Sequence, residues 1–249
     1  MANPRYDRIG RTYAKFRHTE PTWHAEIADS LGDAGRVLNV GAGTGNYEDL
    51  DAQILALEPS RVMIDQRGRG AAPCVQGQAE ALPFCDDAFD ATMGVLTMHH
   101  WSDRERAFAE LARVAPRHVY TVYDTTFARD FWLLDYFPET RVDPMEVNAP
   151  TPTVLANHFD VIDVRTLWVP RECREGFAAA SWARPHDYLD PEMQEAISLL
   201  ALCDPDVRAR GTAQLRDDLE SGAWAERYAD IAALDRADFG YRLVTAVRR

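Results

Sequence analysis

Two adjacent histidines are the side chains of this sequence best suited to acid–base chemistry. His99 and His100 stand just after residues 91–96, an apolar run that predicts a buried strand. Imidazole exchanges a proton near neutral pH, so either ring could act as a general base. Residues that follow a parallel strand face the ligand crevice of an α/β sheet, and we therefore predict a catalytic role for this pair. A packing role, with one ring bonded to the backbone and the other set against the next helix, is the alternative that the sequence leaves open.

A glycine-rich turn predicts where a nucleoside cofactor binds. Residues 37–40 form an apolar strand that leads into Gly41, Gly43 and Gly45, and glycines at such a turn let the backbone approach a ligand closely. A dinucleotide-binding turn would carry its last glycine where Asn46 stands, so a pyrophosphate is not the expected ligand. A nicotinamide-dependent oxidoreductase is an alternative only if Asn46 tolerates a pyrophosphate, which a titration with NAD would test.

Two later segments narrow the class of cofactor. The apolar run at residues 54–57 ends in Glu58, where a doubly wound fold presents an acid to ribose hydroxyls. Further on, residues 78–84 lead through two aspartates to the run at residues 89–96. Over roughly residues 5–125, this order of motifs resembles the class I S-adenosylmethionine-dependent methyltransferases, in particular the branch of the ubiquinone and menaquinone methyltransferases.

The resemblance implies an activity and a set of binding residues. It implies that S-adenosylmethionine is converted to S-adenosylhomocysteine while a methyl group passes to an O, N or C atom of a small-molecule metabolite. The glycines would line the methionine half of the cofactor, Glu58 would bind the ribose, and Ala79 with Glu80 would lie by the adenine. The implied cofactor-binding residues are Tyr13, Asn39, Gly41, Gly43, Gly45, Glu58, Pro59, Gln78, Ala79, Glu80 and Leu96.

Two positions depart from the pattern of that family. Asn39 and Gln78 stand where the family often carries acids. An amide forms hydrogen bonds but does not offset a cationic ammonium as a carboxylate does. The alternative function is therefore a protein that binds the cofactor without methylating, as a sensor or as the catalyst of a rearrangement.

The elements around these motifs indicate an α/β fold. Tyr6, Ile9, Tyr13 and Phe16 recur at helical spacing, which predicts a leader helix that either covers the cofactor or simply packs on the domain. Residues 102–105 form a capping box, which predicts a helix start before the strand at residues 118–123. We predict a Rossmann-like sheet of seven strands, with helices on both faces, in one domain over residues 1–249.

The last two predicted strands are far apart in the sequence. Residues 159–167 and 239–247 read as strands, and the stretch between them is far longer than an ordinary connection. Asp190-Pro191 and Asp204-Pro205 are each a helix cap followed by proline at the first helical position. We predict that residues 170–238 are an all-helical insertion that covers the active site, with residues 126–155 as a second cover. Tyr123 and Asp124 are weaker candidates for holding a substrate there.

Composition limits the partners. The formal net charge of −13 opposes binding to a nucleic acid backbone. No apolar run is long enough to span a bilayer and the start of the sequence lacks an apolar signal region, so we expect a cytoplasmic protein that binds no membrane. The four cysteines are scattered, which indicates reduced thiols and no metal site. The sequence leaves the oligomeric state and the substrate open.

Overall fold

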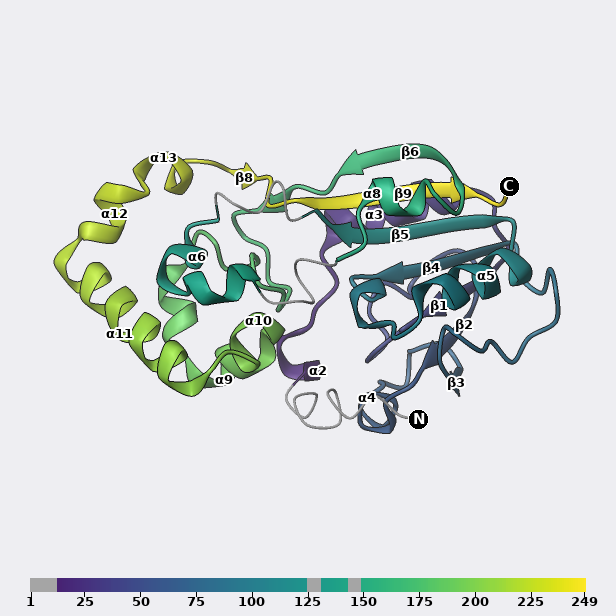
Figure 1. Cartoon of the computed structure of the whole chain (residues 1–249), viewed down its shortest axis with the longest axis horizontal. Coiled ribbons are helices and arrows are strands. Elements are labelled where there is room, and N and C mark those ends of the chain that lie inside the picture. Colours follow the sequence, from purple (N-terminus) through teal and green to yellow (C-terminus); the bar gives the residue numbers. More distant parts are fainter. Residues whose placement is uncertain (1–12, 125–130, 143–148) are drawn as a thin grey trace.

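A seven-stranded sheet organises the described part of the chain, which in this computed structural model comprises residues 13–124, 131–142 and 149–249. The strand order is β3-β2-β1-β4-β5-β9-β6; β9 runs antiparallel to both of its neighbours, and the other pairs are parallel (Figure 1). The strands are β1 Arg36–Val40, β2 Gln53–Glu58, β3 Cys74–Gln76, β4 Ala91–Val95, β5 Arg117–Tyr123, β6 Asp160–Thr166 and β9 Tyr241–Val247. The predicted Rossmann-like fold with seven strands is confirmed.

Helices cover both faces of the sheet because its strands are apolar on both sides. Val119 of β5 belongs to the buried cluster that includes Ile27 of α3 (Pro21–Leu31), whereas the next residue, Tyr120, belongs to the cluster around α5 (Arg104–Val114). Successive side chains of a strand point to opposite faces, so one run of apolar residues supplies both layers. Two shorter helices, α4 (Arg61–Asp65) and α8 (Pro152–Leu155), lie beside β2 and β6.

The helix before β1 differs from the predicted leader. Most of the leader, residues 1–12, lies outside the described residues, and only α2 (Tyr13–Phe16) is seen of it. The sequence analysis missed α3, although Glu20 followed by Pro21 was an available signal: the Glu20 carboxylate accepts a hydrogen bond from the Thr22 amide and caps the helix.

The crossover between β1 and β2 contains no helix. Residues 41–52, all of them described, pass from one parallel strand to the next through turns alone. The glycine turn is therefore not followed by a helix N-terminus, the element that binds pyrophosphate in dinucleotide sites. This connection argues against the nicotinamide-dependent alternative.

The capping box predicted at residues 102–105 is wrong by one residue. Asp103 is the N-cap of α5 and accepts a hydrogen bond from the Arg106 amide at 3.1 Å. Ser102 is drawn away because its amide and its hydroxyl both donate to Glu80, at 2.7 and 2.9 Å. A carboxylate 22 residues away in the sequence thus binds the serine that the local pattern assigns to the cap.

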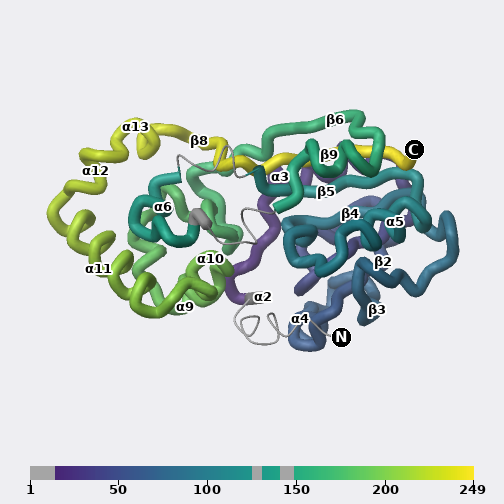
Figure 2. Tube along the Cα trace, in the orientation of Figure 1, coloured from purple at the N-terminus to yellow at the C-terminus, as the bar shows by residue number. Residues whose placement is uncertain are grey.

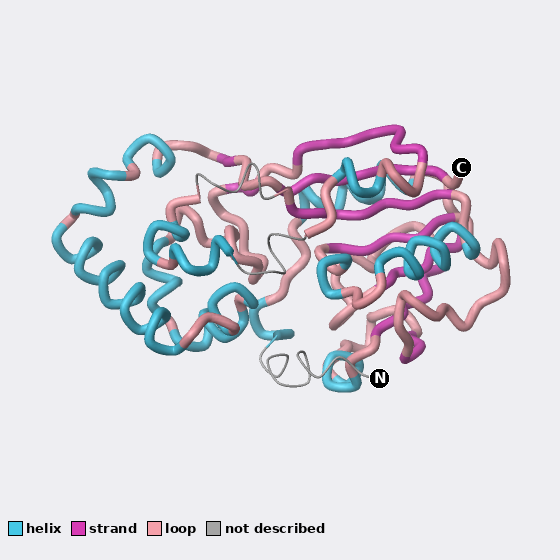
Figure 3. Tube along the Cα trace, in the orientation of Figure 1, coloured by secondary structure: helices cyan, strands magenta, loops and turns pink. Residues whose placement is uncertain are grey.

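A helical lobe lies beyond the carboxyl ends of the parallel strands, and the arrowheads of β4 and β5 point towards it (Figure 1). Figure 3 shows how the helices gather in the lobe and the long strands in the other half. The lobe is built mainly from the segment between β6 and β9, together with α6 and η4. Its elements are α6 Leu133–Tyr136, η4 Pro138–Val142, η5 Pro185–Leu189, α9 Pro191–Ala196, α10 Ser198–Ala201, α11 Pro205–Ser221, α12 Ala223–Arg227 and α13 Ala229–Ala232.

The insertion is not entirely helical, which corrects the prediction. Its two ends pair as an antiparallel ribbon of β7 (Val169–Pro170) and β8 (Arg236–Ala237). The caps at Asp190 and Asp204 are confirmed, since each carboxylate accepts hydrogen bonds from the first turn of α9 or α11. The two ends of the insertion therefore lie side by side, where the chain leaves β6 and where it returns to β9.

Candidate active site

The glycine turn lies at the carboxyl end of β1 and is closely packed. Gly41, Gly43 and Gly45 have φ values of 72°, 54° and 98°, in the left-handed region that favours glycine. A Cβ at Gly41 would lie 1.8 Å from the Thr97 hydroxyl oxygen, so the turn after β4 packs directly on the turn after β1. The Gly41 amide donates to the Leu57 carbonyl at 2.8 Å, which holds the turn against β2.

Glu58 ends β2 and faces the glycine turn. Its carboxylate accepts hydrogen bonds from the Gly43 amide at 2.8 Å and from the Ser60 amide at 2.9 Å, and the residue is 5% exposed. The carboxylate thus lies beside the glycine turn at the carboxyl end of β2, where a doubly wound fold presents an acid to the sugar of a nucleoside.

A buried ion pair supports the turn from behind. The Glu48 carboxylate accepts hydrogen bonds from the Asn39 amide at 3.0 Å and from the Arg67 guanidinium at 2.6 Å, and both charged side chains are at most 6% exposed. Arg67 also donates to the Gly43 carbonyl at 3.1 Å. Asn39 thus lies beside a carboxylate, but the charge of that carboxylate is paired with Arg67. Sequence reasoning gave Glu48 and Arg67 no role, and the position of Glu48 just after the glycines was the one signal available.

The residues predicted around the adenine occupy a second loop. Gln78 and Ala81 form an isolated antiparallel bridge, and Ala79 is buried among the apolar side chains of the α5 face. The Glu80 carboxylate binds the start of α5, where Ser102 donates to it. The Pro59 carbonyl accepts a hydrogen bond from the Gln76 side chain. The adenine role of this loop stays a prediction.

The histidine pair lies on a short 3-10 helix, η2 (Met98–His100), directly after β4. The ring centroids of His99 and His100 are 3.8 Å apart with an interplanar angle of 51°. Leu96 precedes them at φ 49°, a rare conformation for leucine, and its amide donates to the Thr121 hydroxyl at 2.8 Å.

A cavity joins the histidine pair to the lobe. Its empty space is about 660 Å³, which includes the part open to solvent. Its described walls carry mainly aromatic and aliphatic side chains; Arg17 and the two histidines are the basic groups there, and none of the described wall residues is an Asp or Glu. The lining residues are Arg17, Leu96, His99, His100, Tyr123, Phe131, Leu134, Ala149, Gly176, Phe177, Ala178, Ser198, Leu199 and Tyr241.

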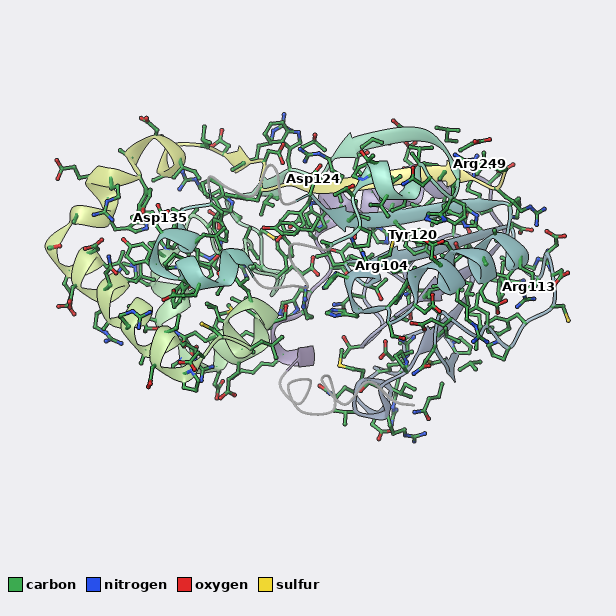
Figure 4. All side chains as sticks on the ribbon, viewed as in Figure 1. Arg104, Arg113, Tyr120, Asp124, Asp135 and Arg249 are labelled. Carbon is green, nitrogen blue, oxygen red and sulfur yellow. The ribbon has the colours of Figure 1, made fainter. Side chains whose placement is uncertain are left out.

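Other predicted residues lie at or near this cavity. Tyr123 lines it, and Asp124, labelled in Figure 4, lies where the sheet meets the lobe, with its amide bonded to the Gly240 carbonyl. The backbone of Tyr13 belongs to α2, but its side chain lies outside the described residues. Trp132 and Phe137 are buried in the core of the lobe and do not line the cavity.

Neither a metal site nor a membrane helix is found in the described part of the chain. None of its clusters of His, Cys, Asp and Glu could hold a metal ion. None of the helices described combines the length and the apolar character needed to cross a bilayer.

Comparison with known proteins identifies the class. Residues 38–121 match the family described as "Methyltransferase domain". A demethylmenaquinone methyltransferase of Renibacterium salmoninarum is 34% identical over 100 residues, which cover 37% of this chain and 42% of that protein. The uncharacterised methyltransferase YcgJ of Bacillus subtilis is 32% identical over 90 residues, or 36% of its length. This chain thus matches less than half of the length of these curated relatives.

Solved structures extend the likeness to the lobe. The structure of a presumed methyltransferase from an antibiotic biosynthesis pathway of Anabaena variabilis is 28% identical, with a TM-score of 0.82, over 95% of this chain and 99% of that one. The YcgJ structure, at 18% identity and a TM-score of 0.56, shares the fold over 92% of this chain and 99% of its own.

The sheet order, the glycine turn and these matches define a class I methyltransferase fold. Residues 38–121 carry the match to the methyltransferase family, and the described sheet has the fold of the class I S-adenosylmethionine-dependent methyltransferases.

Proposed function

We propose that this protein transfers the methyl group of S-adenosylmethionine to an O, N or C atom of a small molecule that binds between the sheet and the lobe. The observation that carries the proposal is the position of the cavity. It is bounded by Leu96 and the histidine pair on the sheet side and by Phe177 and Leu199 on the lobe side. The glycine turn and Glu58 lie at the same edge of the sheet, where ligands of open α/β folds bind.

The residues around the glycine turn would hold the cofactor. Glu58, held beside the turn by the Gly43 and Ser60 amides, would accept the sugar hydroxyls. Arg67 would keep the turn in place through the Gly43 carbonyl. When bound, S-adenosylmethionine supplies a methyl group on a positively charged sulfur.

The cavity residues would orient the acceptor and exclude water. Methyl transfer is an in-line displacement, and orientation alone contributes on the order of 7 kcal/mol or more in favourable systems. His99 or His100 would take the proton of an acceptor hydroxyl, ammonium or acidic carbon. The aromatic rings of Tyr123, Phe177 and Tyr241 would form an apolar wall against the substrate.

The first experiment measures binding of S-adenosylhomocysteine to the purified protein by calorimetry. We expect heat of binding for the wild type and a loss of affinity of at least about tenfold in Glu58→Ala, because hydrogen bonds to a charged group are strong. Glu226→Ala, at an exposed position of α12, is the matched control and should bind as the wild type does. If the wild type gives no heat, the proposed function is wrong.

A second experiment tests the histidines. With labelled S-adenosylmethionine and a panel of small molecules, His99→Ala or His100→Ala should lower turnover by about a hundredfold, while affinity for S-adenosylhomocysteine stays near that of the wild type. His186→Ala, an exposed histidine of the lobe, should turn over normally. The base role is refuted if both variants keep wild-type turnover from about pH 6 to about pH 9.

A cofactor-binding protein that does not methylate is the second candidate. The observation that favours it is the Asn39 amide, which donates to a carboxylate whose charge Arg67 already pairs. Binding of S-adenosylmethionine without turnover on any member of the panel would support this candidate. The cytoplasmic location and the absence of nucleic acid and membrane partners stay predictions.

A further inference from the structure

A buried polar link joins the glycine turn to the lobe. The Tyr47 hydroxyl, two residues beyond Gly45, donates to a carboxylate oxygen of Glu175 at 2.5 Å. Tyr47 is 2% exposed and Glu175 is 4% exposed. Glu175 directly precedes Gly176, Phe177 and Ala178, which line the cavity. One hydrogen bond therefore connects a residue two positions beyond the glycine turn to a residue next to the cavity wall.

The segment between α2 and α3 completes this link. Arg17 donates to the other Glu175 oxygen at 3.1 Å, and the two side chains are 11% and 3% exposed. The Glu20 amide donates to the Tyr47 hydroxyl oxygen at 3.2 Å. Figure 2 shows this purple segment running between the lobe and the sheet. The carboxylate is thus held from both sides in a place that excludes water.

The link is stiff as well as buried. Tyr47 has a φ of 63°, in the left-handed region that a bulky residue rarely adopts, so its conformation depends on the contacts of its side chain. A Cβ at Gly176 would lie 2.9 Å from the Phe16 carbonyl oxygen, so the backbone at Gly176 packs directly against the end of α2. Burial also raises the pKa of Glu175 and that of Tyr47, which agrees with a site screened from solvent. A displacement of the glycine turn would therefore be transmitted to the cavity wall through the hydrogen bond between Tyr47 and Glu175.

We propose that Tyr47 and Glu175 are positioning residues that couple occupancy of the glycine turn to the order of the cavity wall at residues 173–178. The inference rests on the proposed function for the identity of the ligand, an adenosyl sulfonium or its demethylated product. Because coupling between two sites is reciprocal, a substrate in the cavity would in turn tighten cofactor binding. Cofactor binding would then further restrain the substrate wall of the lobe.

Hydrogen exchange of the full chain, with and without S-adenosylhomocysteine, tests the coupling. In the wild type we expect the ligand to slow exchange at residues 41–47 and also at residues 173–178. In Tyr47→Phe the protection at residues 41–47 should remain, while the protection at residues 173–178 falls by at least half. Glu175→Gln keeps the size of the side chain and should likewise lose protection at residues 173–178 while keeping it at residues 41–47. It replaces Tyr47→Phe in the test if that variant folds poorly.

Tyr136→Phe is the matched control. Tyr136 is also buried, and its hydroxyl also donates to a carboxylate, that of Asp218, but within the lobe. This variant should keep both protected segments. Affinity for S-adenosylhomocysteine should change less than about threefold in Tyr47→Phe and Tyr136→Phe alike, because neither hydroxyl is proposed to touch the ligand.

The possible outcomes separate the two proposals. If the ligand protects residues 41–47 of the wild type but not residues 173–178, the coupling is refuted and the proposed function stands. If Tyr47→Phe and Glu175→Gln keep full protection at residues 173–178, the coupling exists but the two residues do not carry it, and the inference is wrong. If the ligand neither binds nor protects any segment, both proposals fall.

Discussion

His118 makes the stability of this protein depend on pH, and the size of the effect follows from its surroundings. The residue lies on β5 with no exposed surface, and its Nδ1 is 2.9 Å from the Thr92 hydroxyl. Its Nε2 is buried and finds no hydrogen-bond partner in the described part of the chain. Burial, with a smaller contribution from the Arg248 charge, lowers the pKa of His118 from 6.5 to about 3.

The sign and the magnitude follow from linkage. The unfolded chain binds a proton at His118 below about pH 6.5, whereas the folded chain does not until about pH 3. The stabilisation is therefore fully present above the unfolded pKa and is lost as the pH falls between these two values. The free energy of unfolding should drop by about 2 kcal/mol at pH 5 relative to pH 7, and by about 4 kcal/mol near pH 3, from this residue alone.

Urea unfolding followed by tryptophan fluorescence at pH 5 and at pH 7 measures this loss. His118→Leu has similar volume and does not titrate, so its loss between the two pH values should be about 2 kcal/mol smaller than that of the wild type. His186→Leu, on the exposed surface of the lobe, should keep the wild-type difference. Equal losses for the wild type and His118→Leu would refute the reasoning, because the buried ring would then not control the pH dependence.

Three further changes test the site and the lobe. Gly41→Ala should cost at least about 2 kcal/mol in urea unfolding, because alanine is strained at a φ of 72° and its Cβ would overlap Thr97, whereas Gly70→Ala, in open space, should be nearly neutral; equal stabilities would contradict the packing of the turn. Glu48→Gln should cost about 3 kcal/mol or more in the same assay, since it leaves a buried guanidinium without its counter-ion; a loss below about 1 kcal/mol would disagree. Asp204→Ala removes the cap of α11 and should cost about 1 kcal/mol, seen in a thermal scan as a fall of about 2–4 °C, and an unchanged midpoint would count against the cap.

Local patterns were enough to predict the elements that carry the cofactor side of the site. The apolar strand before Gly41 and the apolar strand that ends in Glu58 were both readable, because a buried parallel strand needs a continuous apolar run and its turn needs glycine. The helical lobe between the last strands could be predicted because two Asp-Pro caps and an unusually long connection are local features.

The wrong or missing predictions have two causes. Glu80 draws Ser102 away from the cap of α5, and no rule of local spacing reports a partner 22 residues away. The helix-free connection after the glycine turn also escaped prediction, since short polar stretches fit turns and helix starts equally well.

The amino-acid sequence by itself determined the main strands of the sheet, the glycine turn and the acid at the end of β2, because periodicity, caps and conformational preference act within a few residues. Only the tertiary structure decided which side chains meet across long separations: Glu48 with Arg67 behind the turn, and Tyr47 with Glu175, which are 128 residues apart, between turn and lobe. Such contacts depend on how the elements pack, and burial then gives each charge or hydroxyl a specific partner.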